Sequence, residues 1–288
     1  SFRQNRRMLC DLRPSRPDEG REGPEYQVSR RNVEAGKNAE RNFGQRSFRM
    51  GRADLRRQNM YDLKKTDPEF AERFEHFAFD EVVNEAGQQL EAPVRYLAVL
   101  AALLGCGGVD AYADTLPKAL DNGVTPVMVK ECVYQATDYL GYGRVLPFLK
   151  VTNTVLEQRG VALPLPGQAT TGMDDRLEKG VAAQVTIFGE GMNEAWKKGH
   201  INRWLADNCF GDYYTRTGLD LKQREMITFC FLMAQGGCEP QLTAHARGNM
   251  NLGNGRDFLT RVISQCLPYI GYPRSLKAIA CINKAAEA

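Results

Sequence analysis

Residues 219–254 read LDLKQREMITFCFLMAQGGCEPQLTAHARGNMNLGN and carry the start and stop signals of two consecutive helices. Asp220, with a glutamine three residues later, matches the capping box that begins a helix, and the helix predicted over 221–235 ends at the following pair of glycines. Pro240 suits the first turn of a second helix, which is predicted to end at Gly253. Two helices joined by a short glycine turn therefore organise this region.

The same order of helix signals occurs earlier in the chain. Helices are predicted over 93–104, which ends at a GCGG run, and over 109–121, and a third helix opens at Thr125-Pro126. At an offset of 130 residues, identical residue types recur: Gly123, Gln135, Tyr139, Gly141, Tyr142 and Arg144 match Gly253, Gln265, Tyr269, Gly271, Tyr272 and Arg274. Strand signals are nearly absent, because no stretch sustains an apolar–polar alternation. The sequence predicts an all-α protein with two tandem helical repeats.

The chain divides into four parts. Residues 1–52 form a basic arm with little apolar periodicity, which is expected to be extended or disordered unless it docks on a partner. Within it, residues 1–50 hold 12 Lys and Arg against 7 Asp and Glu. We assign the first helical repeat to 53–160, a Pro/Gly-rich linker to 161–175 and the second helical repeat to 176–288.

The composition limits the class of protein. The formal net charge is +3, and outside the arm basic and acidic residues nearly balance, so no nucleic-acid partner is expected. No apolar run reaches the roughly 18 to 20 residues that a membrane span needs. The eight cysteines are scattered, without a CxxC pair or a zinc-ligand spacing to a histidine. We therefore expect a cytoplasmic protein with reduced thiols, no bound metal and no membrane contact.

One predicted helix is too apolar to be covered by a single neighbour. Residues 226–234 read MITFCFLMA, which is apolar almost all round and indicates burial on more than one side. The partners that can bury such a helix are the other repeat and other subunits. The pattern therefore predicts a homo-oligomer, for example a ring in which the two repeats alternate.

Two stretches resemble the carboxymuconolactone decarboxylase family: GVTPVMVKECVYQATDYLGYGRVLPFL (123–149) and residues 219–254. They look like the two halves of a tandem member, and the resemblance covers residues 55–285. It implies an all-helical fold that assembles as trimers or hexamers, so we expect a trimer of two-repeat chains or a larger assembly. Members of the family include decarboxylases of a carboxylated muconolactone and the related alkylhydroperoxidase D-type thiol peroxidases.

For the thiol peroxidase branch, the resemblance implies two cysteines three residues apart and a histidine four residues after the second. Cys238 fits the first cysteine and His245 fits the histidine, but Gln241 stands in place of the second cysteine. A disulfide of that kind therefore cannot form within the chain. Cys238 lies at a predicted helix N-terminus, where backbone N–H groups lower a thiol pKa, so it is a candidate single reactive cysteine. The alternative is a small buried hydrophobic residue.

Glu225 and His245 are the candidate acid–base pair. Histidine side chains serve as acids or bases near neutral pH. Cys238 lies about two turns, roughly 10 Å, from His245 along the helix, which argues against a direct contact between them. An antiparallel hairpin through the glycine pair can instead bring Glu225 to His245. The alternatives are a polar residue at a helix contact for His245 and a first-turn glutamate that suits the helix dipole for Glu225.

Three further residues are candidate contacts for a small-molecule substrate. Gln241 lies four residues before His245 and hence on the same helical face. Arg247 can bind a carboxylate in a bidentate manner, and a solvated charge is its alternative. Tyr269 can line the pocket wall, and core packing is its alternative.

The first repeat lacks this set of residues. It has other residue types at the corresponding places: Thr115, Pro117 and Val94 stand where the second repeat has His245, Arg247 and Glu225. Cys106 falls near the place of Cys238 but has no histidine to work with. We therefore expect the first repeat to be a structural partner with a degenerate site and the second repeat to carry any chemistry.

These residues support three hypotheses about function. The first is a lyase that decarboxylates a small carboxylated lactone or related acid, in which Glu225 and His245 move the proton and Arg247 or backbone N–H groups hold the carboxylate. No metal or organic cofactor is implied, because a lactone-activated or β,γ-unsaturated acid can delocalise its own carbanion. The second is a thiol peroxidase that uses Cys238 with an external thiol. The third is a non-enzymatic oligomeric scaffold whose basic arm docks on a partner.

Overall fold

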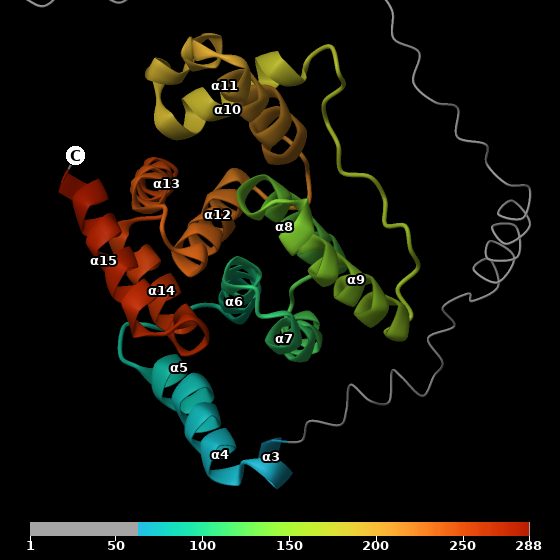
Figure 1. The fold of residues 1–288 in the computed structure, drawn as a ribbon, viewed down its shortest axis with the longest axis vertical. Helices are drawn as coiled ribbons and strands as arrows, with labels where there is room; N and C mark the ends of the chain where they lie inside the picture. The colour runs from blue at the N-terminus through green and yellow to red at the C-terminus, as the bar shows by residue number, and fades with distance from the viewer. Residues whose placement is uncertain (1–62, 288) are drawn as a thin grey trace, which may run out of the picture. The chain divides into compact units, whose positions relative to one another are not determined.

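The computed structural model describes residues 63–287, and every regular element in this range is a helix (Figure 1). The prediction of an all-α protein is therefore confirmed for this part of the chain. The basic arm predicted over 1–52 lies outside the described residues, and so do the first ten residues of the predicted first repeat.

The first half of the described chain begins with short helices and continues with four long ones. In chain order these are α3 (Leu63–Thr66), α4 (Pro68–His76), the π-helical η2 (Phe77–Glu81), α5 (Val82–Asn84), α6 (Ala92–Cys106), α7 (Val109–Asp121), α8 (Pro126–Leu140) and α9 (Tyr142–Gln158). The segment between α9 and α10, which contains the predicted linker, has no long regular element.

The second half repeats the four long helices after several additional elements. In chain order these are α10 (Arg176–Phe188), the 3-10 turns η3 (Glu190–Met192) and η4 (Ala195–Lys198), α11 (His200–Trp204), the π-helical η5 (Leu205–Tyr214), α12 (Leu221–Gln235), α13 (Glu239–Asn251), α14 (Arg256–Ile270) and α15 (Tyr272–Glu287). Helices α12 to α15 follow α6 to α9 in order, and α12 and α13 have the same lengths as α6 and α7. The tandem repeat is therefore visible helix by helix.

The helix boundaries follow from local signals. The Asp220 carboxylate accepts from the Gln223 backbone N–H at 2.8 Å, and the Gln223 side chain accepts from the Asp220 backbone N–H at 3.0 Å. These two bonds satisfy donors that the first turn of α12 leaves unpaired, so the predicted capping box is present. Gly123 and Gly253 follow α7 and α13 with φ of 92° and 93°, a region that favours glycine. The same turn thus closes the same helix pair in both repeats.

Helices α6 and α12 pack against each other in the middle of the helical part (Figure 1). They approach closely at Gly105, where a Cβ atom would lie 2.6 Å from the Phe231 carbonyl oxygen. Buried apolar residues of both repeats form one continuous cluster, so the repeats share a single core. The apolar stretch 226–234 is buried by helices of this same chain, and its composition does not by itself require a second subunit.

Each repeat packs its third long helix against the first long helix of the other repeat. Helix α8 packs on α12, and α14 packs on α6. A buried Arg–Gln bond crosses both contacts: Arg224 Nη1 donates to Gln135 Oε1 at 2.9 Å, and Arg95 Nε donates to Gln265 Oε1 at 2.8 Å. The repeats therefore complete each other reciprocally.

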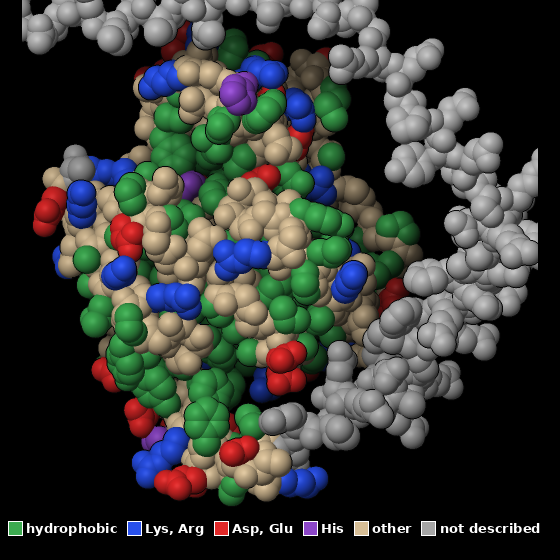
Figure 2. All heavy atoms as spheres, in the orientation of Figure 1, with side chains coloured by type: hydrophobic (Ala, Val, Ile, Leu, Met, Phe, Trp, Pro, Cys, Tyr) green, Lys and Arg blue, Asp and Glu red, His purple; other side chains and the backbone are tan. Residues whose placement is uncertain are grey.

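The surface of the described residues mixes charged and apolar side chains. On the face shown in Figure 2, Lys and Arg are interspersed with Asp and Glu, with no continuous patch of one sign. None of the helices within residues 63–287 is long and apolar enough to cross a membrane.

Candidate active site

The glycine turn between α12 and α13 brings Glu225 and His245 into direct contact. Glu225 lies in the second turn of α12 and is fully buried, and His245 lies in the middle of α13. The Nδ1 atom of His245 is 2.9 Å from Glu225 Oε2 and 3.1 Å from Glu225 Oε1. The predicted acid–base contact across the helix hairpin is therefore present in the structure.

Gly248 makes room for this contact. A Cβ atom at Gly248 would lie 2.8 Å from Glu225 Oε2 and 2.9 Å from Phe188 Cε1. Distances of this kind are too short for a methyl group beside a fixed carboxylate. The absence of a side chain three residues after His245 thus lets Glu225 sit between α12, α13 and the end of α10.

The His245 ring is oriented from two sides. Tyr139 from α8 and Phe188 from α10 meet it edge-on, with ring centroids 5.5 Å and 5.3 Å away. Only 11% of the His245 side chain is exposed. Because the Glu225 carboxylate accepts a hydrogen bond, Nδ1 is the protonated nitrogen and Nε2 is the atom left for a reacting group.

Glu225 also belongs to a chain of buried hydroxyl groups. Its Oε1 accepts from the Tyr214 hydroxyl at 2.8 Å. The same hydroxyl lies 2.7 Å from Thr228 Oγ1 and 2.8 Å from the Tyr139 hydroxyl. Sequence reasoning missed Tyr214, Thr228 and Tyr139, although Tyr139 was visible as one member of a repeated tyrosine pair.

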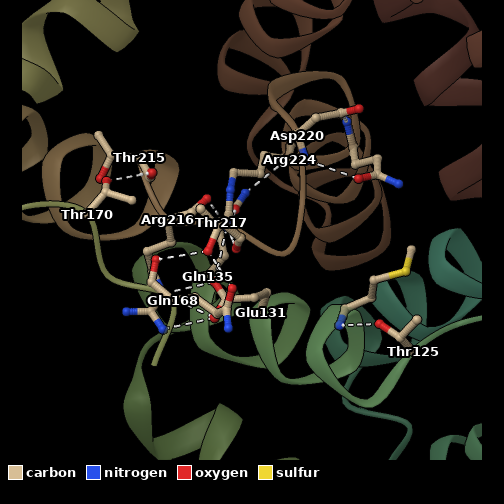
Figure 3. Close-up of polar contacts among 12 residues, drawn as sticks. Thr125, Glu131, Gln135, Gln168, Thr170, Thr215, Arg216, Thr217, Asp220 and Arg224 are labelled. Carbon is tan, nitrogen blue, oxygen red and sulfur yellow. Dashed lines mark hydrogen bonds and ion pairs between the residues drawn. The ribbon is translucent and has the colours of Figure 1, made fainter. Parts of the chain in front are cut away.

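A buried ionic network fixes the first turns of α12 on α8 (Figure 3). Arg224 is fully buried and donates from Nη2 to Glu131 Oε2 at 3.0 Å. Glu131 also accepts from Arg216, whose Nε lies 2.8 Å from Oε2 and 3.2 Å from Oε1 and whose Nη2 lies 2.9 Å from Oε1. These charge-assisted bonds join the turn of α12 that carries Arg224 and Glu225 to α8.

The structure contradicts the role expected of Tyr269. Tyr269 lies on α14, where it packs edge-on against Phe74 at 5.8 Å, and Tyr139 is the tyrosine that meets His245. The reason is the reciprocal packing, since α8 of the first repeat contacts α12 whereas α14 contacts α6. Tyr139, from the first repeat, is therefore the member of the repeated tyrosine pair that faces the site of the second repeat.

The structure also contradicts the lowered thiol pKa expected for Cys238. Cys238 caps α13, but its side chain makes no capping bond, and Sγ donates to the Leu232 carbonyl oxygen at 3.4 Å. Burial raises the pKa of the Cys238 thiol, and the neighbouring Glu239 raises it further. The hydrogen bonds of Sγ involve Leu232 and Gln235, and none joins it to His245. The thiol is therefore partly buried and not paired with His245.

Gln241 and Arg247 occupy different faces of α13. Gln241 is exposed and lies about one turn before His245 on the same face. Arg247 is two residues after His245, so its side chain leaves the helix about 200° away from the His245 ring. Arg247 is half-buried and forms no ion pair within the described residues. The helix therefore does not bring Arg247 to the ring.

The first repeat has no acid–base pair at the corresponding place. The helix bounds put Tyr96 in the position of Glu225, so the assignment of Val94 to that position was wrong by two residues. Thr115 takes the position of His245, and its hydroxyl donates to the Ala111 carbonyl oxygen at 2.7 Å. The first repeat therefore has no Glu–His pair at these two positions, and the degeneracy of its site stays a prediction.

Two hollows in the described part of the chain lie away from the Glu225–His245 pair. The larger one, of about 360 Å³, lies between α8, α9 and η5, and its wall includes Tyr134, Arg216 and Asp212. The smaller one lies beside Cys238. Within residues 63–287 no three His, Cys, Asp or Glu side chains gather at a point that could hold a metal ion.

The sequence of the chain is similar to proteins of a known family. The sequence model of the carboxymuconolactone decarboxylase family matches residues 68–154 and again residues 200–284. The 4-carboxymuconolactone decarboxylase of Acinetobacter baylyi is 26% identical over 120 residues, which cover 37% of this chain and 83% of that protein. A solved structure of a candidate gamma-carboxymuconolactone decarboxylase subunit from Burkholderia xenovorans is 21% identical, with a TM-score of 0.45, and the match covers 78% of this chain and 89% of that one. Because the two family matches together take in more than half of its residues, this chain belongs to the carboxymuconolactone decarboxylase family, with two copies of the family repeat in one polypeptide.

Proposed function

We propose that the protein is a carboxy-lyase that removes CO2 from a small carboxylated lactone or a related organic acid. The observation that carries the proposal is the buried contact between Glu225 and His245 in the second repeat. Family membership and the similarity to a 4-carboxymuconolactone decarboxylase support the same reaction class. We further propose that the chain works as a homo-oligomer.

The proposed reaction needs one proton for each turnover. Loss of CO2 from a carboxylate leaves an electron pair on carbon, and a neighbouring carbonyl group of the lactone delocalises it. His245 in its doubly protonated form gives the Nε2 proton to that carbon, and Glu225 stabilises the imidazolium before the transfer. The ring returns to its starting state by taking a proton from solvent.

The environment of His245 suits this role. The edges of Tyr139 and Phe188 hold the ring, so that the direction of Nε2 is fixed before the substrate arrives. The Glu225 carboxylate accepts from Tyr214 as well as from His245, which keeps it from rotating away. A proton donor whose position is fixed in advance costs less to align in the transition state.

A thiol peroxidase is less well supported by the same residues. Burial raises the pKa of the Cys238 thiol, which lowers the fraction of reactive thiolate. Gln241 stands where the peroxidase pattern has its second cysteine.

The test measures two activities for the native protein, Cys238→Ser and His245→Ala. We expect CO2 release from 4-carboxymuconolactone or a related acid to survive in Cys238→Ser and to fall by about 10²-fold or more in His245→Ala. Consumption of peroxide that is present in the native protein and lost in Cys238→Ser would instead identify a thiol peroxidase. Circular dichroism of each variant checks that the helical fold is intact.

A further inference from the structure

We propose that Tyr139, a residue of the first repeat, is a positioning residue for His245 in the second repeat and acts through Tyr214 and Glu225. The proposal rests on the proposed function, because it concerns the same acid–base pair. It assigns to the first repeat a direct part in the site, although that repeat has no acid–base pair of its own.

The directions of the hydrogen bonds follow from counting protons. A carboxylate only accepts, so the Tyr214 hydroxyl donates its single proton to Glu225 at 2.8 Å. The Tyr214 oxygen must then accept from its two other neighbours, Tyr139 at 2.8 Å and Thr228 at 2.7 Å. In the contact between Thr228 and Gln135 the amide Nε2 is the donor, at 2.8 Å. The Thr228 proton is therefore still available for Tyr214. Every proton in this group therefore points towards Glu225.

The chain of hydrogen bonds continues one residue beyond Tyr139, to Cys209. The Tyr139 hydroxyl donates its proton to Tyr214, so the Tyr139 oxygen can accept a hydrogen bond. The Cys209 thiol donates to this oxygen at 3.7 Å. Tyr214 and Cys209 are nearly fully buried, so solvent water is not within reach as an alternative hydrogen-bond partner. The arrangement is consistent in one direction only, with Glu225 as the final acceptor.

The hydrogen bond from Tyr139 prevents the Tyr214 hydroxyl from turning its proton away from Glu225. Two donated bonds, from Tyr139 and Thr228, occupy both lone pairs of the Tyr214 oxygen and leave Glu225 as the acceptor for its proton. A carboxylate held by Tyr214 in this way accepts from Nδ1 of His245, so the neutral imidazole carries its proton on Nδ1 and exposes a bare Nε2. Without the Tyr139 hydroxyl, Tyr214 can rotate away from Glu225, and the choice of nitrogen is no longer fixed.

The chain itself supplies a matched control. Tyr269 occupies the position of Tyr139 in the other repeat, but it packs against Phe74 and has no contact with the Glu225–His245 pair. Removing the hydroxyl of either tyrosine changes the sequence in the same way at equivalent helix positions. Only the change at Tyr139 alters the bonds that lead to His245.

The experiment observes the His245 ring by NMR in protein labelled with 15N-histidine. The chain has three histidines, and the spectrum of His245→Gln identifies the signals of His245. At a pH where the ring is neutral, we expect the wild type and Tyr269→Phe to carry the proton on Nδ1. We expect Tyr139→Phe, and more strongly Tyr214→Phe, to show a mixture of the two tautomers.

Kinetics provide a second readout. We expect Tyr139→Phe to lower kcat by about tenfold with KM within about twofold, and Tyr269→Phe to match the wild type. A wild-type tautomer together with wild-type kcat in both Tyr139→Phe and Tyr214→Phe would overturn the proposal and leave the proposed function standing. A tautomer shift in Tyr139→Phe, in a protein that decarboxylates none of the acids offered, would instead support the positioning role and contradict the proposed function.

Discussion

The two repeats have the same framework and different chemistry. Two equivalent hydrogen bonds join the repeats, each between a buried arginine of one repeat and a glutamine of the other. The pairs are Arg95–Gln265 and Arg224–Gln135. At the positions next to this framework the residue types diverge: Tyr96 and Thr115 in the first repeat stand where the second has Glu225 and His245. The bonds that hold the repeats together and the acid–base pair are therefore separable. Both Arg–Gln pairs hold the fold together, whereas the proposed reaction uses the single Glu225–His245 pair.

Replacing Arg224 or Arg95 is expected to have the largest effect on stability and to show that the two Arg–Gln contacts differ in strength. Arg224→Ala takes a fully buried cation away from the buried Glu131 carboxylate, and we expect a loss of about 3 kcal/mol or more in the free energy of unfolding. Arg95→Ala breaks bonds to the neutral Gln265 and to the Ala78 carbonyl oxygen, with an expected loss of about 1–3 kcal/mol. Urea unfolding of both variants measures the difference, and equal losses would show that Glu131 contributes nothing to it.

Adding one methyl group at Gly248 tests the site without removing a polar group. In Gly248→Ala the new Cβ lies 2.8 Å from Glu225 Oε2, so we expect a loss of about 1–3 kcal/mol in stability and a clear loss of decarboxylation. The corresponding residue of the first repeat is the exposed Lys118, and Lys118→Ala is expected to change stability by about 0.5 kcal/mol or less. A fully active Gly248→Ala would mean that Glu225 does not need its present position.

Asp138 of the first repeat is expected to make the stability of the protein depend on pH. Burial raises the pKa of this carboxyl from 3.8 to about 7, and the charge of Asp212 acts in the same direction. Oδ2 of Asp138 is buried without a hydrogen-bond partner among the described residues. The equivalent residue of the second repeat is Pro268, which does not titrate. Only the first-repeat position therefore carries this ionisable group.

The sign of the effect follows from the raised value. Between pH 3.8 and about 7 the folded protein binds a proton at Asp138 that the unfolded chain releases, so this group lowers stability as pH rises through that window. Asp138→Asn removes the effect. We expect the stability of the variant relative to the wild type to rise by about 2–3 kcal/mol between pH 5 and pH 8, measured by denaturant unfolding. A difference from the wild type that is the same at both pH values would contradict the raised pKa.

Local signals explain why much of the fold was predictable. The helix predicted over 221–235 coincides with α12, because its capping box and terminal glycine act within a few residues of chain. The contact between Glu225 and His245 was predictable for the same reason, since one glycine turn reverses the chain between them.

The unpredicted features depend on contacts between distant parts of the chain. Tyr139 and Tyr269 have the same local pattern, and only the reciprocal packing of α8 and α14 decides which of them meets His245. Tyr214 lies at the end of the π-helical η5, whose wider turn does not follow the usual helical period. The raised thiol pKa of Cys238 comes chiefly from burial, which depends on the packing of the whole chain.

The central claim is that the acid–base pair of the second repeat carries the reaction and that the equivalent residues of the first repeat do not. It is tested most directly by the rate of CO2 release from 4-carboxymuconolactone, or from a related acid that the native protein decarboxylates, in Glu225→Gln and Tyr96→Phe. An amide at 225 keeps the shape of the side chain but removes the charge that supports the His245 imidazolium. We predict that kcat falls by about 10²-fold or more in Glu225→Gln and is unchanged in Tyr96→Phe. A Glu225→Gln protein as active as the wild type, or an equal loss in Tyr96→Phe, would contradict the account.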